Sequence, residues 1–175
     1  MKSTKWLLFW VMILMVLLLP DVIYAEANVP LKVTYIENTT PAKMRVGNQT
    51  LIKLKIMNTG SEVWNKDEYF ISYHWLATDG SPVMYEGPRI KLKHDVIPGT
   101  DIQTDIRIVP PAKEGAYILQ WDMVHEGVTW FSKISKDNTD QYQVTVVKNN
   151  VRTFWFILFG ILLLSYFFIL KKISK

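Results

Sequence analysis

The sequence predicts an all-β fold, an immunoglobulin-like β-sandwich flanked by an N-terminal signal helix and a C-terminal transmembrane helix. Three observations support this fold class. Apolar and polar residues alternate through most of the middle of the chain, as in half-buried strands. Gly, Pro, Asn and Asp interrupt the alternation every ten residues or so, which is typical of short antiparallel strands in a sandwich. No helical period occurs between the two apolar end segments.

The N-terminal segment has the features of a secretory signal. Lys2 and Lys5 precede an apolar run of 14 residues, Trp6–Leu19. That run is shorter than the roughly 17–25 residues that a transmembrane helix needs. A basic start, an apolar centre and an Ala-x-Ala site ending at Ala27 predict a signal peptide over residues 1–27. An uncleaved signal anchor is the alternative.

The C-terminal segment is predicted to cross the membrane once. Phe154–Leu170 is a run of 17 residues without charge, with aromatic residues near both ends and Lys171, Lys172 and Lys175 after it. We expect a transmembrane helix over 152–170 and a basic cytoplasmic tail over 171–175. Both segments place the domain at 28–148 on the extracytoplasmic side of a cell membrane.

Composition excludes several classes of function. The chain has no cysteine, which excludes disulfides, thiolate metal sites and cysteine nucleophiles, and a disulfide-free extracytoplasmic domain suits a bacterial protein. The net charge is +4, but Glu26–Asn150 contains 14 basic and 15 acidic residues. The positive excess therefore belongs to the two end segments, and we expect no nucleic-acid partner.

The strands follow one another at short intervals. Between Asp101 and Ile108, apolar or small residues alternate strictly with charged or amide residues, and Pro110-Pro111 ends the pattern because proline cannot donate to a sheet. The sequence predicts strands, in chain order, at Leu31–Glu37, Gln49–Asn58, Tyr69–Ala77, near Met84, at Arg89–Leu92, Asp101–Ile108, Gly115–Val124, Val128–Phe131 and Tyr142–Val147.

The predicted core is rich in tryptophan. Glu114–Leu119 resembles the tyrosine corner of immunoglobulin-like domains, in which a tyrosine hydroxyl bonds to the backbone upstream. Trp75, on the third long strand, takes the place of the core tryptophan of those domains. The residues expected to build the core and its edges are Trp64, Trp75, Tyr117, Leu119 and Trp121.

Several short motifs resemble one known family. They are Asn58-Thr59-Gly60 before Trp64, Ser72–Leu76, Gly87 with Arg89, Asp95–Gly99, Leu119–Asp122 and Glu126–Phe131. As a set, they resemble the immunoglobulin-like four-tryptophan domain first described in selective-autophagy receptors, in the bacterial form often appended to glycosyltransferases. The resemblance covers 31–147 and implies a non-catalytic accessory or protein-binding role, since this chain carries no enzyme domain.

A candidate binding patch follows from the alternation. If Trp75 and Trp121 face inward, His74, Gln120 and Asp122 face outward from the same sheet. The predicted patch consists of His74, Arg89, Gln120, Asp122, Glu126 and Trp130, with packing in the core as the equal alternative for Trp130. The alternative is a solvated sheet face with satisfied cross-strand hydrogen bonds. We expect alanine at both His74 and Asp122 to leave stability nearly unchanged.

No catalytic, metal or cofactor site is expected. The three histidines lack the spacing of metal ligands, and no nucleophile or phosphate-binding motif occurs. We expect a membrane-tethered protein-interaction or assembly module, with a carbohydrate-binding module for cell-surface glycan as the alternative. Trp130 and Tyr85 decide between them: exposed coplanar rings favour glycan, and an exposed apolar patch favours a protein.

Overall fold

The computed structural model describes residues 29–148 of the chain. The predicted signal segment (1–27), transmembrane helix (152–170) and basic tail (171–175) lie outside the described residues. Within 29–148, no helix is both long enough and apolar enough to cross a bilayer.

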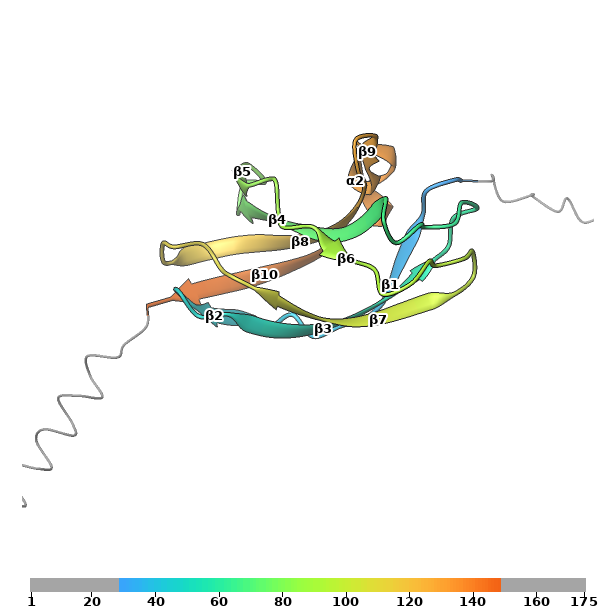
Figure 1. Ribbon diagram of the computed structural model, residues 1–175. Coiled ribbons are helices and arrows are strands. Elements are labelled where there is room, and N and C mark those ends of the chain that lie inside the picture. The colour runs from blue at the N-terminus through green and yellow to red at the C-terminus, as the bar shows by residue number, and fades with distance from the viewer. Residues whose placement is uncertain (1–28, 149–175) are drawn as a thin grey trace, which may run out of the picture.

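The described residues form two facing β-sheets (Figure 1). The first sheet has the strand order β1-β3-β7. Its strands are Val33–Asn38, Thr50–Asn58 and Asp101–Ile108. The second sheet has the order β2-β10-β8-β4-β5, with β6 paired to β4 and β9 paired to β8. In chain order these strands are β2 Lys43–Arg45, β4 Tyr69–Ala77, β5 Pro82–Met84, β6 Ile90–Lys91, β8 Gly115–His125, β9 Thr129–Trp130 and β10 Asp140–Val147.

The strand order is that of an immunoglobulin-like sandwich, so the predicted all-β sandwich is confirmed. The sheet β1-β3-β7 corresponds to strands A, B and E, and β10-β8-β4 to strands G, F and C. All pairings are antiparallel except that of β2 with β10.

The core lies between the two sheets and follows the alternation. Along β7, every second residue is buried. On β3, Ile52, Leu54 and Ile56 are fully buried. They face the second sheet, whose inward side chains include Trp75 and Trp121. All of the residues assigned to the core are buried or half-buried, with Trp64, Leu119 and Trp121 at 0% exposure.

Tyr117 makes the hydrogen bond that defines a tyrosine corner. Its hydroxyl donates to the backbone carbonyl of Lys113 at 3.1 Å, four residues upstream. The ring also packs edge-on against Trp75, with centroids 6.3 Å apart. The side chain thereby ties the loop before β8 to the core.

Replacing Tyr117 by phenylalanine should lower the free energy of unfolding by about 1 kcal/mol, the usual net value of one intramolecular hydrogen bond. Urea unfolding of the full-length chain in detergent measures this change. Lys113→Ala is the matched control, because the acceptor is a main-chain carbonyl that alanine keeps. Equal losses in the two variants would contradict the assigned bond.

The segment after β9 differs from the sequence prediction. A strand was expected at Val128–Phe131, with no helix after it. Instead β9 ends at Trp130, and a short helix, α2 (Phe131–Ile134), and a 3-10 turn, η1 (Lys136–Asn138), follow it. The expectation that no helix occurs between the end segments is therefore wrong for these few residues.

Long-range hydrogen bonds explain the helical turns. Asn138 is 1% exposed. Its amide nitrogen donates to the carbonyls of Leu31 at 3.2 Å and Phe131 at 3.1 Å, and its oxygen accepts from the amide of Val33 at 3.1 Å. One side chain thus ties η1 to α2 and to the start of the first sheet, a contact that no local periodicity reveals.

Candidate functional site

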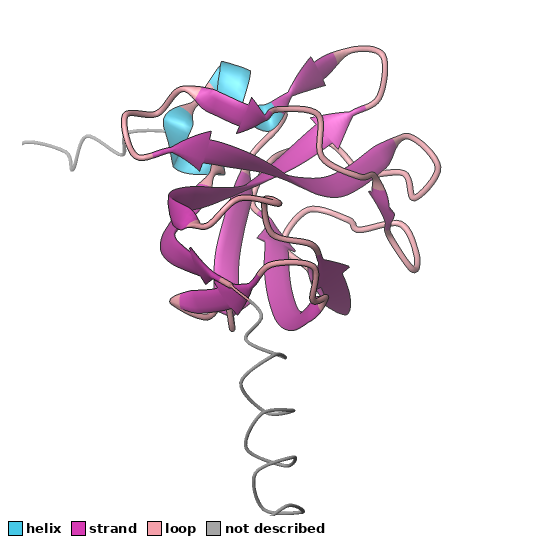
Figure 2. Cartoon of the chain, turned by 90° about the vertical axis from the view of Figure 1, so that its left-hand side faces the viewer, coloured by secondary structure: helices cyan, strands magenta, loops and turns pink. Residues whose placement is uncertain are grey.

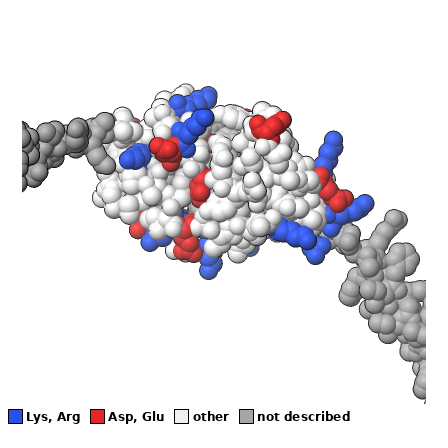
Figure 3. Space-filling view, turned by 180° about the vertical axis from the view of Figure 1, so that it is seen from behind, with Lys and Arg blue, Asp and Glu red and all other residues white. Residues whose placement is uncertain are grey.

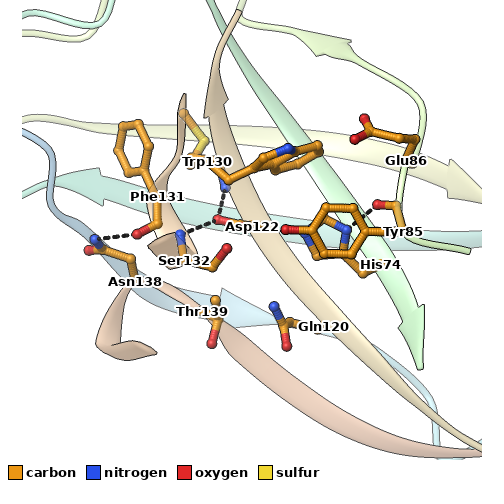
Figure 4. Close-up of polar contacts among 12 residues, drawn as sticks. His74, Tyr85, Glu86, Gln120, Asp122, Trp130, Phe131, Ser132, Asn138 and Thr139 are labelled. Atoms are coloured by element: carbon orange, nitrogen blue, oxygen red, sulfur yellow. Dashed lines mark hydrogen bonds and ion pairs between the residues drawn. The ribbon is translucent and has the colours of Figure 1, made fainter. Parts of the chain in front are cut away.

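Four of the predicted patch residues lie together on the outer face of the second sheet in Figure 4, namely His74, Gln120, Asp122 and Trp130. The pairing of β4 with β8 puts His74 opposite Gln120 and Ser72 opposite Asp122. The β5–β6 segment and the β9–α2 segment rise from this face (Figure 1). The outward direction inferred from the alternation is thus the direction observed.

His74 and Asp122 form a buried pair at the centre of this face. His74 Nε2 lies 3.1 Å from Asp122 Oδ2, and both side chains are 0% exposed. The other ring nitrogen, Nδ1, contacts the backbone carbonyl of Tyr85. Both ring nitrogens face oxygen acceptors, so both contacts are hydrogen bonds only when each nitrogen carries hydrogen.

Asp122 also holds the β9–α2 segment. Its Oδ1 accepts from the backbone amides of Met123 at 2.8 Å and Ser132 at 3.1 Å. Hydrogen bonds to a carboxylate are stronger than those between neutral groups. This side chain therefore joins three parts of the face: β4 through His74, its own strand β8, and α2 through Ser132.

Trp130 covers the buried pair. Its ring centroid lies 4.5 Å from that of His74, and only 5% of the residue is exposed. The guanidinium of Arg89 lies over the tryptophan ring, 4.6 Å from its centroid, as in a cation–π contact. Of the two alternatives for Trp130, the structure therefore shows the packing residue and not the exposed contact residue.

Arg89 and Glu126 close the outer side of the cluster. Arg89 Nε donates to Glu126 at 2.7 Å, and another guanidinium nitrogen donates to Glu86 at 3.0 Å. Gly87 lets this segment approach β4, because an added Cβ would lie 1.9 Å from the carbonyl oxygen of Tyr73. The Gly-x-Arg motif thus has a structural explanation.

The predicted patch needs a correction. His74, Asp122 and Trp130 were expected to be accessible, and all three are buried. The sheet face is the expected one, but the β5–β6 and β9–α2 segments cover it. Replacing His74 and Asp122 by alanine is therefore no longer expected to leave stability unchanged, since the pair is part of the interior.

An open groove lies beside the buried cluster and has a volume of about 550 Å³. Gln120 and Tyr85 contribute to its wall, and the amide of Gln141 donates to Gln120 at 2.7 Å. Lys133 and Lys136 also line it, and no acidic side chain does. Burial, and secondarily the charge of Asp122, raises the pKa of Tyr85 further above neutral pH, where a tyrosine hydroxyl already keeps its hydrogen. We call this the polar groove.

A second groove lies on the other side of β5 and has a volume of about 450 Å³. Its lining is apolar and includes Met84, Pro110 and Pro111, with Val83 and Val109 about half exposed. Sequence analysis did not identify this apolar groove. Its only signal was the Pro110-Pro111 pair, which was interpreted as the end of a strand.

The described residues offer no set of metal ligands. Nowhere in 29–148 do three His, Cys, Asp or Glu side chains lie together in a group that could hold a metal ion. The His74–Asp122 pair lacks a nucleophile and an open approach, since both side chains are fully buried. The accessible chemistry consists of amides, a phenol, two lysines and an apolar groove.

Comparison with known proteins gives likeness of fold only. The sequence matches no protein-family model. No curated protein is significantly similar to it in sequence. Among solved structures, the CARDB domain of a Pyrococcus furiosus protein is similar with 13% identity and a TM-score of 0.40, over 69% of this chain and 94% of that domain. A crystal structure of the same domain in complex with metal ions has 14% identity and a TM-score of 0.39, over 67% and 86%.

A β-glucosidase from Listeria innocua, solved with glucose, is also similar. It shares 12% identity with a TM-score of 0.42, over 70% of this chain and 17% of the enzyme. Identities and TM-scores this low do not bear on ligand or activity.

Proposed function

We propose that this chain is a non-catalytic binding module, tethered on the outer side of a membrane, whose domain docks on another extracytoplasmic or membrane protein. One observation carries the proposal. The edge strand β5 and Tyr85, the residue that follows it, present exposed side chains between the polar groove and the apolar groove. Val83 is 50% exposed and Tyr85 is 38% exposed.

The aromatic residues argue for a protein rather than a sugar. A sugar platform needs accessible, coplanar rings. The rings of Tyr85 and Trp130 are inclined by 64°, and Arg89 lies over Trp130. Exposed valines beside prolines are the kind of apolar surface that protein partners cover.

The edge of the sheet adds to this argument. β5 ends the strand order of the second sheet, so one of its sides has no partner strand. An unpaired edge can accept an extended segment of another protein, and β5 offers three residues to such a segment, the first of them a proline. The buried His74–Asp122 cluster fixes the segments on either side, which lowers the cost of ordering them on binding.

The sequence supplies the membrane part of the proposal. The apolar run Phe154–Leu170 with the lysines after it favours a single anchor, and Trp6–Leu19 favours export of the domain. The resemblance to the bacterial four-tryptophan domain also favours an accessory, protein-binding role. We therefore place the domain outside the cytoplasm, close to the bilayer.

Site-specific photo-crosslinking in intact membranes tests the proposal. A photo-reactive residue at Val83 should capture one defined protein, because this side chain lies between the two grooves. Leu51 is the matched control, with 52% exposure on the outer face of the other sheet. Adding Tyr85→Ala should weaken capture at Val83. Equal capture of the same proteins from Val83 and Leu51 would contradict the proposed contact surface.

Binding of a surface glycan is the second candidate, and the polar groove favours it. Gln120, Gln141 and Tyr85 offer donors and acceptors in this groove, and the two lysines there suit an acidic sugar. If glycan is recovered with the chain, and Gln120→Ala abolishes that recovery without changing capture at Val83, the glycan candidate is supported for this groove.

A further inference from the structure

We propose that the end of the domain where β10 stops binds the phosphate group of an anionic lipid headgroup. The site consists of Lys43 and Arg45 beside a hollow of about 330 Å³. The inference rests on the membrane anchor of the proposed function, because the anchor determines which end of the domain faces the bilayer.

Strand β2 places both cations next to the end of β10. Met44 points into the core and is 2% exposed, so its neighbours Lys43 and Arg45 point outward. The parallel pairing aligns Lys43 with Thr145 and Arg45 with Val147. Figure 1 shows β2 beside the tip of β10, and Figure 2 shows the helical turns at the far end of the domain.

The hollow offers hydrogen-bond donors and no carboxylate. Besides the two cations, its lining includes Asn48, Gln49 and Thr50, and no Asp or Glu lines it. Arginine matches phosphate with a planar pair of donors, and lysine contributes a compact charge. These are the groups that a phosphate diester or monoester requires.

The turn between β2 and β3 holds the hollow open in a defined shape. The amide of Asn48 donates to the carbonyl of Arg45 at 3.1 Å, and the amide of Val46 donates to Val147 at 2.9 Å. Gly47 has a φ of 75°, a conformation that glycine adopts without strain. The backbone therefore fixes the positions from which the two cations extend.

The charges at this end are available to a ligand. Within residues 29–148, neither Lys43 nor Arg45 takes part in an ion pair. Lys148 follows β10 directly, and Arg107 lies near the end of β7 in the other sheet, where it pairs with Leu51 of β3. Figure 3 shows basic side chains at this end of the molecule, with acidic side chains among them.

The distance to the proposed anchor is short. Five residues separate Lys148 from Phe154, the first residue of the apolar run. Even fully extended, the connection spans about 20 Å. Electrostatic attraction decays over about 8 Å at physiological salt, so only cations that a short tether keeps near the headgroups benefit from it. Lys43 and Arg45 are such cations.

Hydrogen exchange of the full-length chain in lipid nanodiscs tests the inference. Exchange of the backbone from 43 to 50 should be several-fold slower in discs that contain phosphatidylglycerol than in discs of phosphatidylcholine alone. The double variant Lys43→Gln with Arg45→Gln should lose this difference. The matched control, Lys53→Gln with Lys91→Gln, removes two exposed lysines away from the hollow and should keep it.

Each remaining outcome has a separate meaning. If exchange slows in neutral discs when millimolar inorganic phosphate is added, but does not slow in discs with phosphatidylglycerol, the site binds free phosphate and the proposal of a lipid headgroup is overturned. No effect of either would overturn the site. If the chain does not stay with the discs in gel filtration, the anchor of the proposed function has failed, while the phosphate measurement on the free chain still tests the hollow.

Discussion

Replacing Trp75 by alanine is expected to lower the free energy of unfolding by about 3–5 kcal/mol, as for other large-to-small changes in a core. The side chain is 1% exposed and lies between the two sheets. Its ring makes edge contacts with Tyr73 and Tyr117, at centroid distances of 6.5 and 6.3 Å. The indole nitrogen donates to the carbonyl of Val109 at 3.1 Å, so alanine also removes a donor.

The loss would be a large part of the total stability, which is about 5–15 kcal/mol for a typical domain. Urea unfolding of the full-length chain in detergent, followed by near-ultraviolet circular dichroism, measures it. Val128→Ala is the control, because Val128 is 68% exposed and a surface change of this kind shifts stability by less than about 0.5 kcal/mol. An unchanged midpoint for Trp75→Ala would contradict its place in the core.

The fold could be predicted because its main signals are local. Strand β4 has the predicted bounds, Tyr69–Ala77. Strand β7 has the predicted alternation of buried and exposed residues, because one of its faces lies toward the core. The very short strand β2 was not predicted. Three residues carry too little periodicity, and its only anchor in the core is Met44.

The site could be predicted only in part. Alternation correctly put His74, Gln120 and Asp122 on one face, but it could not show that two segments cover that face. The cover depends on hydrogen bonds from the sheet to residues outside its long strands, from His74 to the carbonyl of Tyr85 and from the amide of Ser132 to Asp122. One signal was present: Val124 is an apolar residue on the outward side of β8, and it is buried. Strands covered on both faces lose their alternation in this way.

The buried cluster explains how an exposed binding edge can be well ordered. The His74 ring contacts the carbonyl of Tyr85, and the Asp122 carboxylate accepts from the amide of Ser132. Tyr85 and Ser132 both line the polar groove. The residues first predicted to bind a partner therefore support the residues that line the groove, and changes in the cluster should affect binding through the shape of that groove.

Asp122→Ala is expected to cost about 3–5 kcal/mol, because it removes the acceptor of several hydrogen bonds in the interior and leaves their buried donors unpaired. His74 Nε2 and the amide of Ser132 each lose an acceptor, and both atoms belong to buried or half-buried residues. Hydrogen exchange in the α2–η1 segment should rise together with the loss of stability, since the carboxylate is what joins that segment to β8.

Asp122→Asn removes the negative charge of the side chain but keeps its capacity for hydrogen bonds. The amide oxygen can still accept from Met123 and Ser132, and the amide nitrogen can donate to a neutral His74 whose Nδ1 hydrogen points at Tyr85. We therefore expect a cost of only about 1 kcal/mol. Glu126→Gln, in the exposed ion pair with Arg89, should cost less than about 1 kcal/mol.

Chemical unfolding of Asp122→Ala, Asp122→Asn and Glu126→Gln measures the loss of stability in each variant and so ranks the three losses. Equal losses for alanine and asparagine at position 122 would mean that the negative charge itself, rather than the set of hydrogen bonds, stabilises the cover. An unchanged midpoint for Asp122→Ala would mean that water reaches the His74–Asp122 pair. In that case the outer face would be open, and the accessible patch first predicted from the alternation would replace the covered cluster.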